Sequence, residues 1–296
     1  MKGYKELLNE VANHSNLRKL SDDELCLVKA CTLDIFKKIS QVCDDHGLCI
    51  MLGGGSALGA VRHKGFIPWD DDMDLNMPRK DYNCLLQLCE EGVLGDEYDF
   101  TFPSKEHDSP SAFLQIWSKK CFVIGLSGLP HGICIDVFPI EGAPSNKFVW
   151  KTKGYIANVL RLIMNMVGET GKWSEPVKTF YAQDKKFYRF MRCRQFLGRL
   201  FSFVSHKQWV CWYDSFVKCE NIGDLAVIPT GRKLYHGETL PSSIFFPVSK
   251  GVFEGLEVNL PANPDAYLKN LYGDYMKIPP VEKRESHMIV SIEYKH

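Results

Sequence analysis

Residues 52–82 read LGGGSALGAVRHKGFIPWDDDMDLNMPRKDY and combine a turn of small residues with a dense group of acids. The acids are Asp70, Asp71, Asp72 and Asp74. Side chains alternate between the two faces of a strand, so a strand over residues 72–76 points Asp72 and Asp74 the same way. Asp70 follows in phase if the strand begins early. Carboxylates crowded on one face repel each other, and a hard divalent cation with oxygen ligands, Mg²⁺ above all, relieves that repulsion.

The residues before the acids suit a phosphate group. Gly54 and Gly55 let backbone N–H groups approach a phosphate closely, the more so if a helix begins at Ser56. Arg62 and Lys64 add positive charge that can face phosphate oxygens. The stretch therefore predicts an anion site beside a metal site.

Other interpretations of this stretch are weaker. A solvated acidic turn is the ordinary alternative, but apolar residues such as Trp69 and Met73 surround the acids. An EF-hand loop fails because Leu75 stands where its sixth position requires Gly. A dinucleotide-binding fingerprint fails at Leu58, and a phosphate-binding Walker loop fails at Ala60, where Lys is required.

The same stretch resembles the signature of the LicD family of phosphotransferases, which includes fukutin-type ribitol-phosphate transferases. In the wider nucleotidyltransferase superfamily, a Gly-Gly/Ser turn precedes Asp-x-Asp on the next strand. Gly54-Gly55-Ser56 matches the turn and Asp72-Met73-Asp74 the metal pair, within the specific run AVRHKGFIPWDDDMD. A second match is YLKNLYGDYMKIPP at residues 267–280, which resembles the run that ends the family's domain.

A second strand candidate, residues 132–142, places Asp136 in an otherwise apolar run. A buried carboxylate is costly unless it is paired, hydrogen-bonded or metal-bound, and a satisfied core Asp is the alternative. The superfamily pattern has a third carboxylate on a neighbouring strand, at the position that Asp136 matches. The resemblance therefore implies Asp72, Asp74 and Asp136 as catalytic residues. These three and Asp70 would bind Mg²⁺, or Mn²⁺ in its place.

The pattern of elements predicts an α+β fold, and the resemblance implies a nucleotidyltransferase-like mixed β-sheet core flanked by helices. Residues 1–20 are expected to form an N-terminal arm and residues 21–296 the domain, with a helical insertion over about 147–240. Ser21 and Glu24 form a capping box that opens a helix over residues 22–45. Further expectations are strands at 48–52 and 113–117, a helix at 81–92, strands 243–248 and 251–260 paired around Ser249–Lys250, and a helix from Pro264 to Tyr272 between Asn263 and Gly273.

Charge is distributed unevenly along a chain of zero formal net charge. Residues 147–218 hold 14 Lys and Arg against 4 Asp and Glu, interleaved with aromatic residues, whereas residues 65–110 hold 12 acids and 3 bases. Ordinary helices with solvated cations are one interpretation of the basic segment. The sharper one is peripheral contact with an anionic membrane that carries a lipid-linked acceptor. No recognised nucleic-acid module accompanies the charge, so we expect no nucleic-acid partner.

The eleven cysteines form no C-x-x-C pair. The first 20 residues lack the pattern of a signal peptide, and no apolar run reaches the ~18 residues of a membrane span. These features predict free thiols and a cytoplasmic protein. If the protein associates with a membrane, we expect it at the inner face of the cell membrane.

The resemblance implies transfer of a substituted phosphate to a sugar hydroxyl. The best candidate is phosphocholine, carried from CDP-choline to a cell-surface glycan or its lipid-linked precursor, as in lipopolysaccharide, teichoic acid or capsule. Ribitol or glycerol phosphate from a CDP-activated donor, nucleotidylyl transfer that releases pyrophosphate, and an inactive glycan-binding protein remain alternatives. The donor phosphates would contact Gly54, Gly55, Ser56, Arg62 and Lys64, and Asp136 would bridge metals or accept the proton of the attacking hydroxyl.

The head group of the donor depends on different residues. Choline would need aromatic faces, because a quaternary ammonium has no hydrogen bond to donate. The candidates are Trp69, Trp117, Tyr272 and Tyr275. Ribitol or glycerol would instead require hydrogen-bonding side chains. Lys283, Arg284 and His287 follow the last motif, and either phosphate contact or a solvated basic tail fits them.

Overall fold

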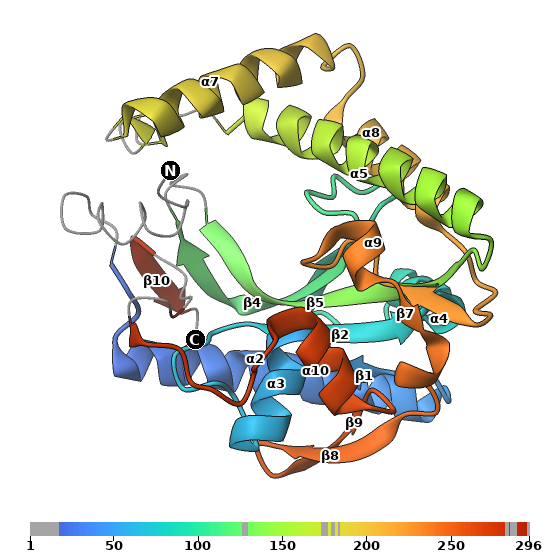
Figure 1. Cartoon of the computed structure of the whole chain (residues 1–296). Coiled ribbons are helices and arrows are strands. Elements are labelled where there is room, and N and C mark those ends of the chain that lie inside the picture. Colours follow the sequence, from blue (N-terminus) through green and yellow to red (C-terminus); the bar gives the residue numbers. More distant parts are fainter. Residues whose placement is uncertain are drawn as a thin grey trace.

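The computed structural model describes residues 18–125, 130–172, 177–178, 181–182, 184–281, 284 and 289–294. Within them, eight strands form one mixed sheet, whose main path is β1 (Met51–Leu52), β2 (Met73–Pro78), β5 (Pro130–Ala143), β4 (Leu114–Ile124) and β10 (Ser291–Tyr294) (Figure 1). The remaining strands are β3 (Tyr98–Thr101), which pairs with β4, and β6 (Leu225–Val227), which joins β5 to β7 (Leu240–Pro241). Only the β2–β5 pair of this sheet is parallel among the described strands. The predicted α+β class is confirmed.

One face of the sheet packs against α2 (Asp22–Asp45) and α4 (Arg79–Glu90). The predicted capping box opens α2, since the Glu24 N–H donates to Ser21 Oγ at 3.3 Å and the Ser21 N–H to Glu24 Oε2 at 2.8 Å. The apolar stripe of α2 is buried in the same core as alternate residues of β2 and β5. These core residues include Ile35, Ile39, Met73, Leu75, Ile135 and Val137.

Three elements border the sheet on the side of β1 and β2: helix α3 (Gly54–His63), helix α10 (Pro264–Tyr272) and the hairpin of β8 (Ser249–Phe253) and β9 (Leu256–Leu260) (Figure 1). Helix α10 is confirmed with its Asn263 cap, whose Oδ1 accepts from the Ala266 N–H at 3.0 Å. Helix α3 begins at Gly54, two residues before the predicted start at Ser56. The sequence prediction also placed the start of α4 two residues late.

The structure contains a β-hairpin in the predicted region, but the position predicted for its turn is wrong. The chain reverses at Glu254–Gly255, where φ is +49° and +77°, and not at Ser249–Lys250. Two residues with positive φ form the turn that matches the twist of paired strands. Residues 243–248, expected as the first strand, instead include the short 3₁₀ helix η1 (Ser242–Ile244) and Pro247, which has no N–H to donate to a strand ladder.

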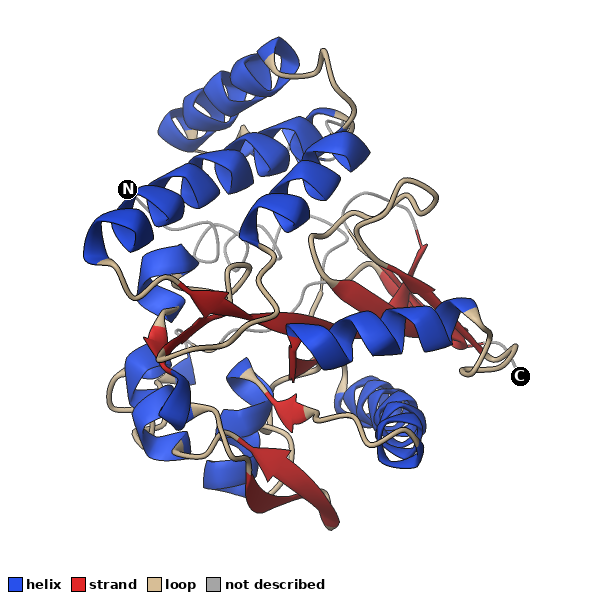
Figure 2. Ribbon diagram, turned by 90° about the vertical axis from the view of Figure 1, so that its right-hand side faces the viewer, coloured by secondary structure: helices blue, strands red, loops and turns tan. Residues whose placement is uncertain are grey.

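A layer of helices lies on the side of the sheet opposite α2 (Figures 1 and 2). It contains α5 (Lys147–Thr170), α7 (Lys185–Leu200), α8 (His206–Val217) and the short α9 (Leu234–Glu238). These helices lie within residues 147–240, where the sequence predicted a helical insertion. Their own apolar cluster includes Ala157, Trp209 and Tyr213. Of the expected N-terminal arm, all but residues 18–20 lie outside the described residues.

A buried ion cluster joins this layer to the sheet. Arg79, 1% exposed, donates from Nε to Glu141 Oε1 at 2.7 Å and from Nη2 to Asp214 Oδ1 at 2.6 Å. The Cys219 N–H donates to the second Glu141 oxygen at 2.7 Å, and the Tyr82 ring centroid lies 4.8 Å from the Arg79 guanidinium carbon. Arg79 of α4 therefore connects strand β5, through Glu141, to helix α8, through Asp214. Removing one partner of such a buried ion pair strongly destabilises the fold, because it leaves a buried charge without compensation.

The eleven cysteines are free thiols, as predicted. Among the described helices, none combines the length and the hydropathy needed to cross a bilayer.

Candidate active site

The acids predicted from two distant motifs meet on the sheet. In the parallel ladder of β2 and β5, Asp74 lies directly opposite Asp136. Since Met73 and Leu75 point into the core against α2, Asp74 points to the other face of the sheet. Gln115 of β4 is the next residue across, and its Nε2 donates to Asp136 Oδ1 at 2.8 Å. The Asp136 carboxylate is therefore oriented by a hydrogen bond from the neighbouring strand, at the centre of the sheet.

The glycine turn is built around the same acids. The Gly53 N–H donates to the Asp74 carbonyl at 2.9 Å, and the Asp74 N–H donates to Ser56 Oγ at 2.9 Å. Gly54 has a φ of +43°, and a Cβ on it would lie 2.6 Å from Asp74 Oδ2. A Cβ on Gly55 would lie 3.1 Å from Asp70 Oδ2. The glycines thus make room for carboxylates at the N-terminus of α3, where the helix dipole favours negative charge.

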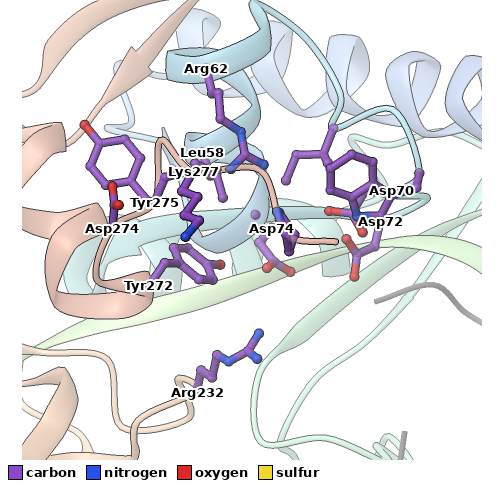
Figure 3. Close-up of a pocket in the computed structure, with 14 residues that line it drawn as sticks. Leu58, Arg62, Asp70, Asp72, Asp74, Arg232, Tyr272, Asp274, Tyr275 and Lys277 are labelled. Carbon is purple, nitrogen blue, oxygen red and sulfur yellow. Dashed lines mark hydrogen bonds between the residues drawn. The ribbon is translucent and has the colours of Figure 1, made fainter. Parts of the chain in front are cut away.

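A cavity of about 320 Å³ opens beside this turn (Figure 3). Its walls include four acids (Asp70, Asp72, Asp74 and Asp274), three cations (Arg62, Arg232 and Lys277) and Gly55 of the glycine turn. Arg62 and Arg232 approach from opposite sides with Asp74 between them (Figure 3). Arg62 is held by the Tyr275 carbonyl at 2.5 Å. The cavity therefore offers cationic groups for phosphate oxygens beside carboxylates for a metal ion.

Three of the four predicted aromatics line this cavity: Trp69, Tyr272 and Tyr275. Cations already cover two of these rings, since the Arg284 guanidinium carbon lies 4.2 Å from the Trp69 ring centroid and that of Arg232 lies 5.8 Å from the Tyr272 centroid.

The other predicted ring and the basic tail lie elsewhere. Trp117 is not among the residues that line the cavity, and its ring fills the space that a side chain at Gly132 would need. Arg284 stacks on a ring, and Lys283 and His287 lie outside the described residues. Lys64 is exposed at the far end of α3, so the structure does not bring it to the cavity. A ten-residue helix separates it from the glycine turn by about 15 Å.

A second cavity of about 220 Å³ adjoins the first and shares Asp74, Arg232 and Tyr272 with it. Its other walls include Asn76, Phe138, Thr230, Glu238 and Tyr267. Tyr267 Oη accepts from the Gly54 N–H at 3.1 Å and from Asn76 Nδ2 at 3.2 Å, so α10 is tied to the glycine turn. Thr230 Oγ1 is buried without a hydrogen-bond partner among the described residues, which marks a polar group available to a ligand.

Burial sets the protonation of groups around the acids. It raises the pKa of Tyr272, and the nearby charges of Asp74 and Asp70 act in the same direction. Burial also raises the pKa of the Cys134 thiol, which lies 3.7 Å from Asp136 Oδ1. Tyr272 and Cys134 therefore stay protonated at neutral pH, and neither adds negative charge beside the carboxylates.

The donor set suits a hard cation, although the described residues contain no group of three His, Cys, Asp or Glu side chains gathered as a formed metal site. Asp74 and Asp136 present carboxylates in register, and Asp72 shares the cavity with Asp74. Carboxylate oxygens are the ligands that Mg²⁺ prefers. The metal ion, Mg²⁺ or Mn²⁺, stays a prediction.

Sequence reasoning missed several residues of the site, above all Arg232, Lys277 and Gln115. Arg232 lies in the segment for which no motif was found, and its loop is fixed by Glu238, whose Oε1 accepts from the Lys233 N–H at 2.7 Å. No periodic pattern marks such a loop. Lys277 lies within the second family-like run and could have been found there. Gln115 could have been found as a polar residue between Leu114 and Ile116 on an apolar strand.

Comparison with known proteins agrees with this geometry. Residues 47–153 match the family described as LicD/FKTN/FKRP, nucleotidyltransferase domain. Over 287 residues the chain is 26% identical to the lipopolysaccharide cholinephosphotransferase LicD of Haemophilus influenzae (strain ATCC 51907 / DSM 11121 / KW20 / Rd). This match covers 92% of the present chain and 98% of the relative. The matched region contains the glycine turn, the acid cluster and Asp136. Residues 47–153 are therefore similar to the nucleotidyltransferase domain of the LicD/FKTN/FKRP family, and the similarity to LicD itself extends over most of the chain.

Proposed function

We propose that this protein transfers phosphocholine from CDP-choline to a sugar hydroxyl of a cell-surface glycan, with lipopolysaccharide or its lipid-linked precursor as the first candidate acceptor. The observation that carries the proposal is the in-register pair of Asp74 and Asp136 beside a cavity lined by Arg62, Arg232 and Lys277. The similarity to a lipopolysaccharide cholinephosphotransferase over nearly the whole chain supports the choice of donor and acceptor.

The two adjoining cavities suit a donor with two parts. CDP-choline carries a nucleotide on one side of its diphosphate and a head group on the other. The shared walls, Asp74, Arg232 and Tyr272, are where the reacting phosphorus would lie. Arg232 is the cation common to both cavities, so it can contact the diphosphate whichever part of the donor enters each cavity.

The reaction breaks one P–O bond of the diphosphate and forms another to the acceptor sugar. Asp136 would accept the proton of the attacking hydroxyl, and the hydrogen bond from Gln115 Nε2 to its Oδ1 would hold the carboxylate in position. CMP leaves with the electrons of the broken bond, and Arg62, Arg232 and Lys277 stabilise its phosphate charge. When bound, Mg²⁺ on Asp72, Asp74 and Asp136 would neutralise charge on the phosphates.

The head group is the least constrained part of the proposal. The rings of Tyr275, Tyr272 and Trp69 line the first cavity and offer aromatic surface for a quaternary ammonium, which would compete with Arg232 for Tyr272 and with Arg284 for Trp69. In the second cavity, Asn76, Thr230 and Glu238 offer hydrogen bonds of the kind that ribitol or glycerol would use. The experiment below therefore compares CDP-choline with CDP-ribitol and CDP-glycerol.

The test is to incubate the protein with Mg²⁺ and CDP-choline, CDP-ribitol or CDP-glycerol, each with a lipopolysaccharide-derived oligosaccharide, and to identify both products by mass spectrometry. The proposal expects CMP and an oligosaccharide that has gained phosphocholine. Gain of ribitol or glycerol phosphate alone would move the donor to the alternative class. A parallel incubation replaces these donors by CTP, and release of pyrophosphate there, with a nucleotide attached to the acceptor, would replace phosphocholine transfer by nucleotidylyl transfer.

A further inference from the structure

Helix α7 is the outermost helix in Figure 1. Several of its large apolar side chains are exposed to solvent. Phe190, Phe196, Leu197 and Leu200 are 46%, 63%, 37% and 56% exposed, and Phe203, just beyond the helix, is 75% exposed. Its opposite face, including Met191 and Gly198, is buried. A Cβ at Gly198 would collide with the Met166 carbonyl of α5, so the helices pack closely there. The exposed face of α7 is thus held in place and is not a loose segment.

The same helix is strongly basic. Residues 185–200 contain six Lys and Arg and no Asp or Glu. Arg194 pairs with Glu169 of α5 at 2.6 Å, on the inner side. Arg192 and Arg199 are exposed, and with Lys178, Phe196 and the buried Gln195 they line a cavity of about 320 Å³ at the side of the helix. Three cations around one cavity suit a phosphate group.

Helix α5 extends the apolar surface. Phe148, Tyr155, Val159 and Leu162 are 78%, 59%, 55% and 47% exposed. Their spacing of three, four and seven residues places them on one side of the helix. Together with the exposed residues of α7, they form what we call the outer face.

The charge and the apolar residues together select the partner of the outer face. A second copy docked through the same face would bring the basic helix against itself, and like charges repel. A nucleic acid would pair with the arginines but leave the apolar side chains without a partner. An anionic lipid bilayer satisfies both, because the arginines reach phosphate head groups while the aromatic and aliphatic side chains enter the acyl boundary.

We infer that the outer face docks the protein on an anionic bilayer, with a lipid head-group phosphate in the cavity of Lys178, Arg192 and Arg199. The catalytic acids point to the face of the sheet opposite α2, which is the side on which the helical layer lies (Figures 1 and 2). Docking would bring that side near the membrane surface. On the proposed function, this is where a lipid-linked acceptor presents its sugar.

The experiment is sedimentation of the full chain with vesicles of phosphatidylcholine alone and of phosphatidylcholine with phosphatidylglycerol in a 7:3 ratio. Binding should be confined to the anionic vesicles. The double variant Arg192→Gln/Arg199→Gln should weaken the apparent affinity by about thirtyfold, because each cation near an anionic surface raises the affinity by about fivefold. Phe196→Ser/Phe203→Ser should weaken it by at least about tenfold through lost apolar burial.

Matched controls take the same kinds of residue from elsewhere on the surface. Lys37→Gln/Lys80→Gln removes two exposed cations, and Val252→Ser/Val281→Ser removes side chains that are 47% and 59% exposed. Both controls should bind vesicles as the wild type does. Circular dichroism of every variant should match the wild type, since the substituted residues are exposed.

Several outcomes would overturn the inference: equal binding to both vesicle types, equal loss in the controls, or no effect of either outer-face variant. A concentration-dependent dimer that Phe196→Ser/Phe203→Ser abolishes would assign the face to a second copy. Tight binding of a single-stranded oligonucleotide, with no vesicle binding, would assign it to nucleic acid. None of these readings depends on turnover, so failure of the proposed transfer reaction would leave this result interpretable.

Discussion

Replacing Gly54 by Ala tests how the glycine turn serves the acids. Gly54 has a φ of +43°, and a Cβ there would lie 2.6 Å from Asp74 Oδ2. The left-handed backbone costs an L side chain about 1–2 kcal/mol. Moving the Asp74 carboxylate away from a rotamer minimum costs about 0.5–1.5 kcal/mol more. We therefore expect the free energy of unfolding to fall by about 1.5–3.5 kcal/mol.

Gly47→Ala separates the two contributions. Gly47 also has a positive φ, +64°, but no atom of the described part of the chain lies within 4 Å of a Cβ placed on it. It ends helix α2, away from the acids, so its substitution carries the backbone cost of about 1–2 kcal/mol without the collision. The difference between the two variants is then the cost of displacing Asp74.

The assay pairs urea denaturation with CMP release from CDP-choline at saturating acceptor. Displacement of a catalytic group by about 1 Å lowers rates by roughly a hundredfold, so we expect a kcat loss of that size in Gly54→Ala. Gly47→Ala should keep the wild-type kcat below its unfolding midpoint. If Gly54→Ala retained the wild-type rate, or lost no more stability than Gly47→Ala, the contact with Asp74 would have no role in the site.

Three further predictions concern the buried charges and the cavity. Arg79→Met leaves Glu141 and Asp214 without their cation, so the free energy of unfolding in urea should fall by about 3–5 kcal/mol, and an unchanged midpoint would contradict this. Burial raises the pKa of Glu238, so the stability linked to this group is full below the ordinary Glu pKa and is lost as pH rises through the raised one. Glu238→Gln should therefore gain stability relative to wild type as the pH rises above the ordinary Glu pKa of about 4, and a difference in the unfolding free energy that does not change with pH would refute this. Arg232→Gln should raise the KM for the donor by about 10–100-fold while circular dichroism stays unchanged, and a wild-type KM would remove Arg232 from the donor site.

Local signals in the sequence predicted local structure well. The capping box at Ser21 and the Asn263–Pro264 start each gave a helix at the predicted place, because a cap is decided by neighbours along the chain. The hairpin turn was misplaced because the apolar run 243–248 resembled a strand, while Glu254–Gly255 carried the actual turn signal. A two-residue turn ending in Gly was the cue that should have decided it.

The site shows the limit of sequence reasoning more clearly. The family pattern named Asp74 and Asp136, but only the register of β2 and β5 shows that they lie side by side. Arg232 reaches the cavity on a loop whose position depends on Glu238, and Lys64, close to the acids in sequence, is separated from them by the length of a helix. Register and loop placement arise from tertiary packing, which residue types and spacing do not encode locally.

The central claim is that Asp74 and Asp136, side by side in the β2–β5 ladder, carry the transfer. The most direct test compares Asp136→Asn and Asp74→Asn with Asp71→Asn, a neighbouring acid that precedes strand β2 and has no place in this ladder, in single-turnover CMP release over a Mg²⁺ titration. The account predicts losses of at least about a hundredfold for the first two variants, a changed Mg²⁺ dependence for Asp74→Asn, and near wild-type behaviour for Asp71→Asn. Equal rates in all three variants, or a loss confined to Asp71→Asn, would contradict it.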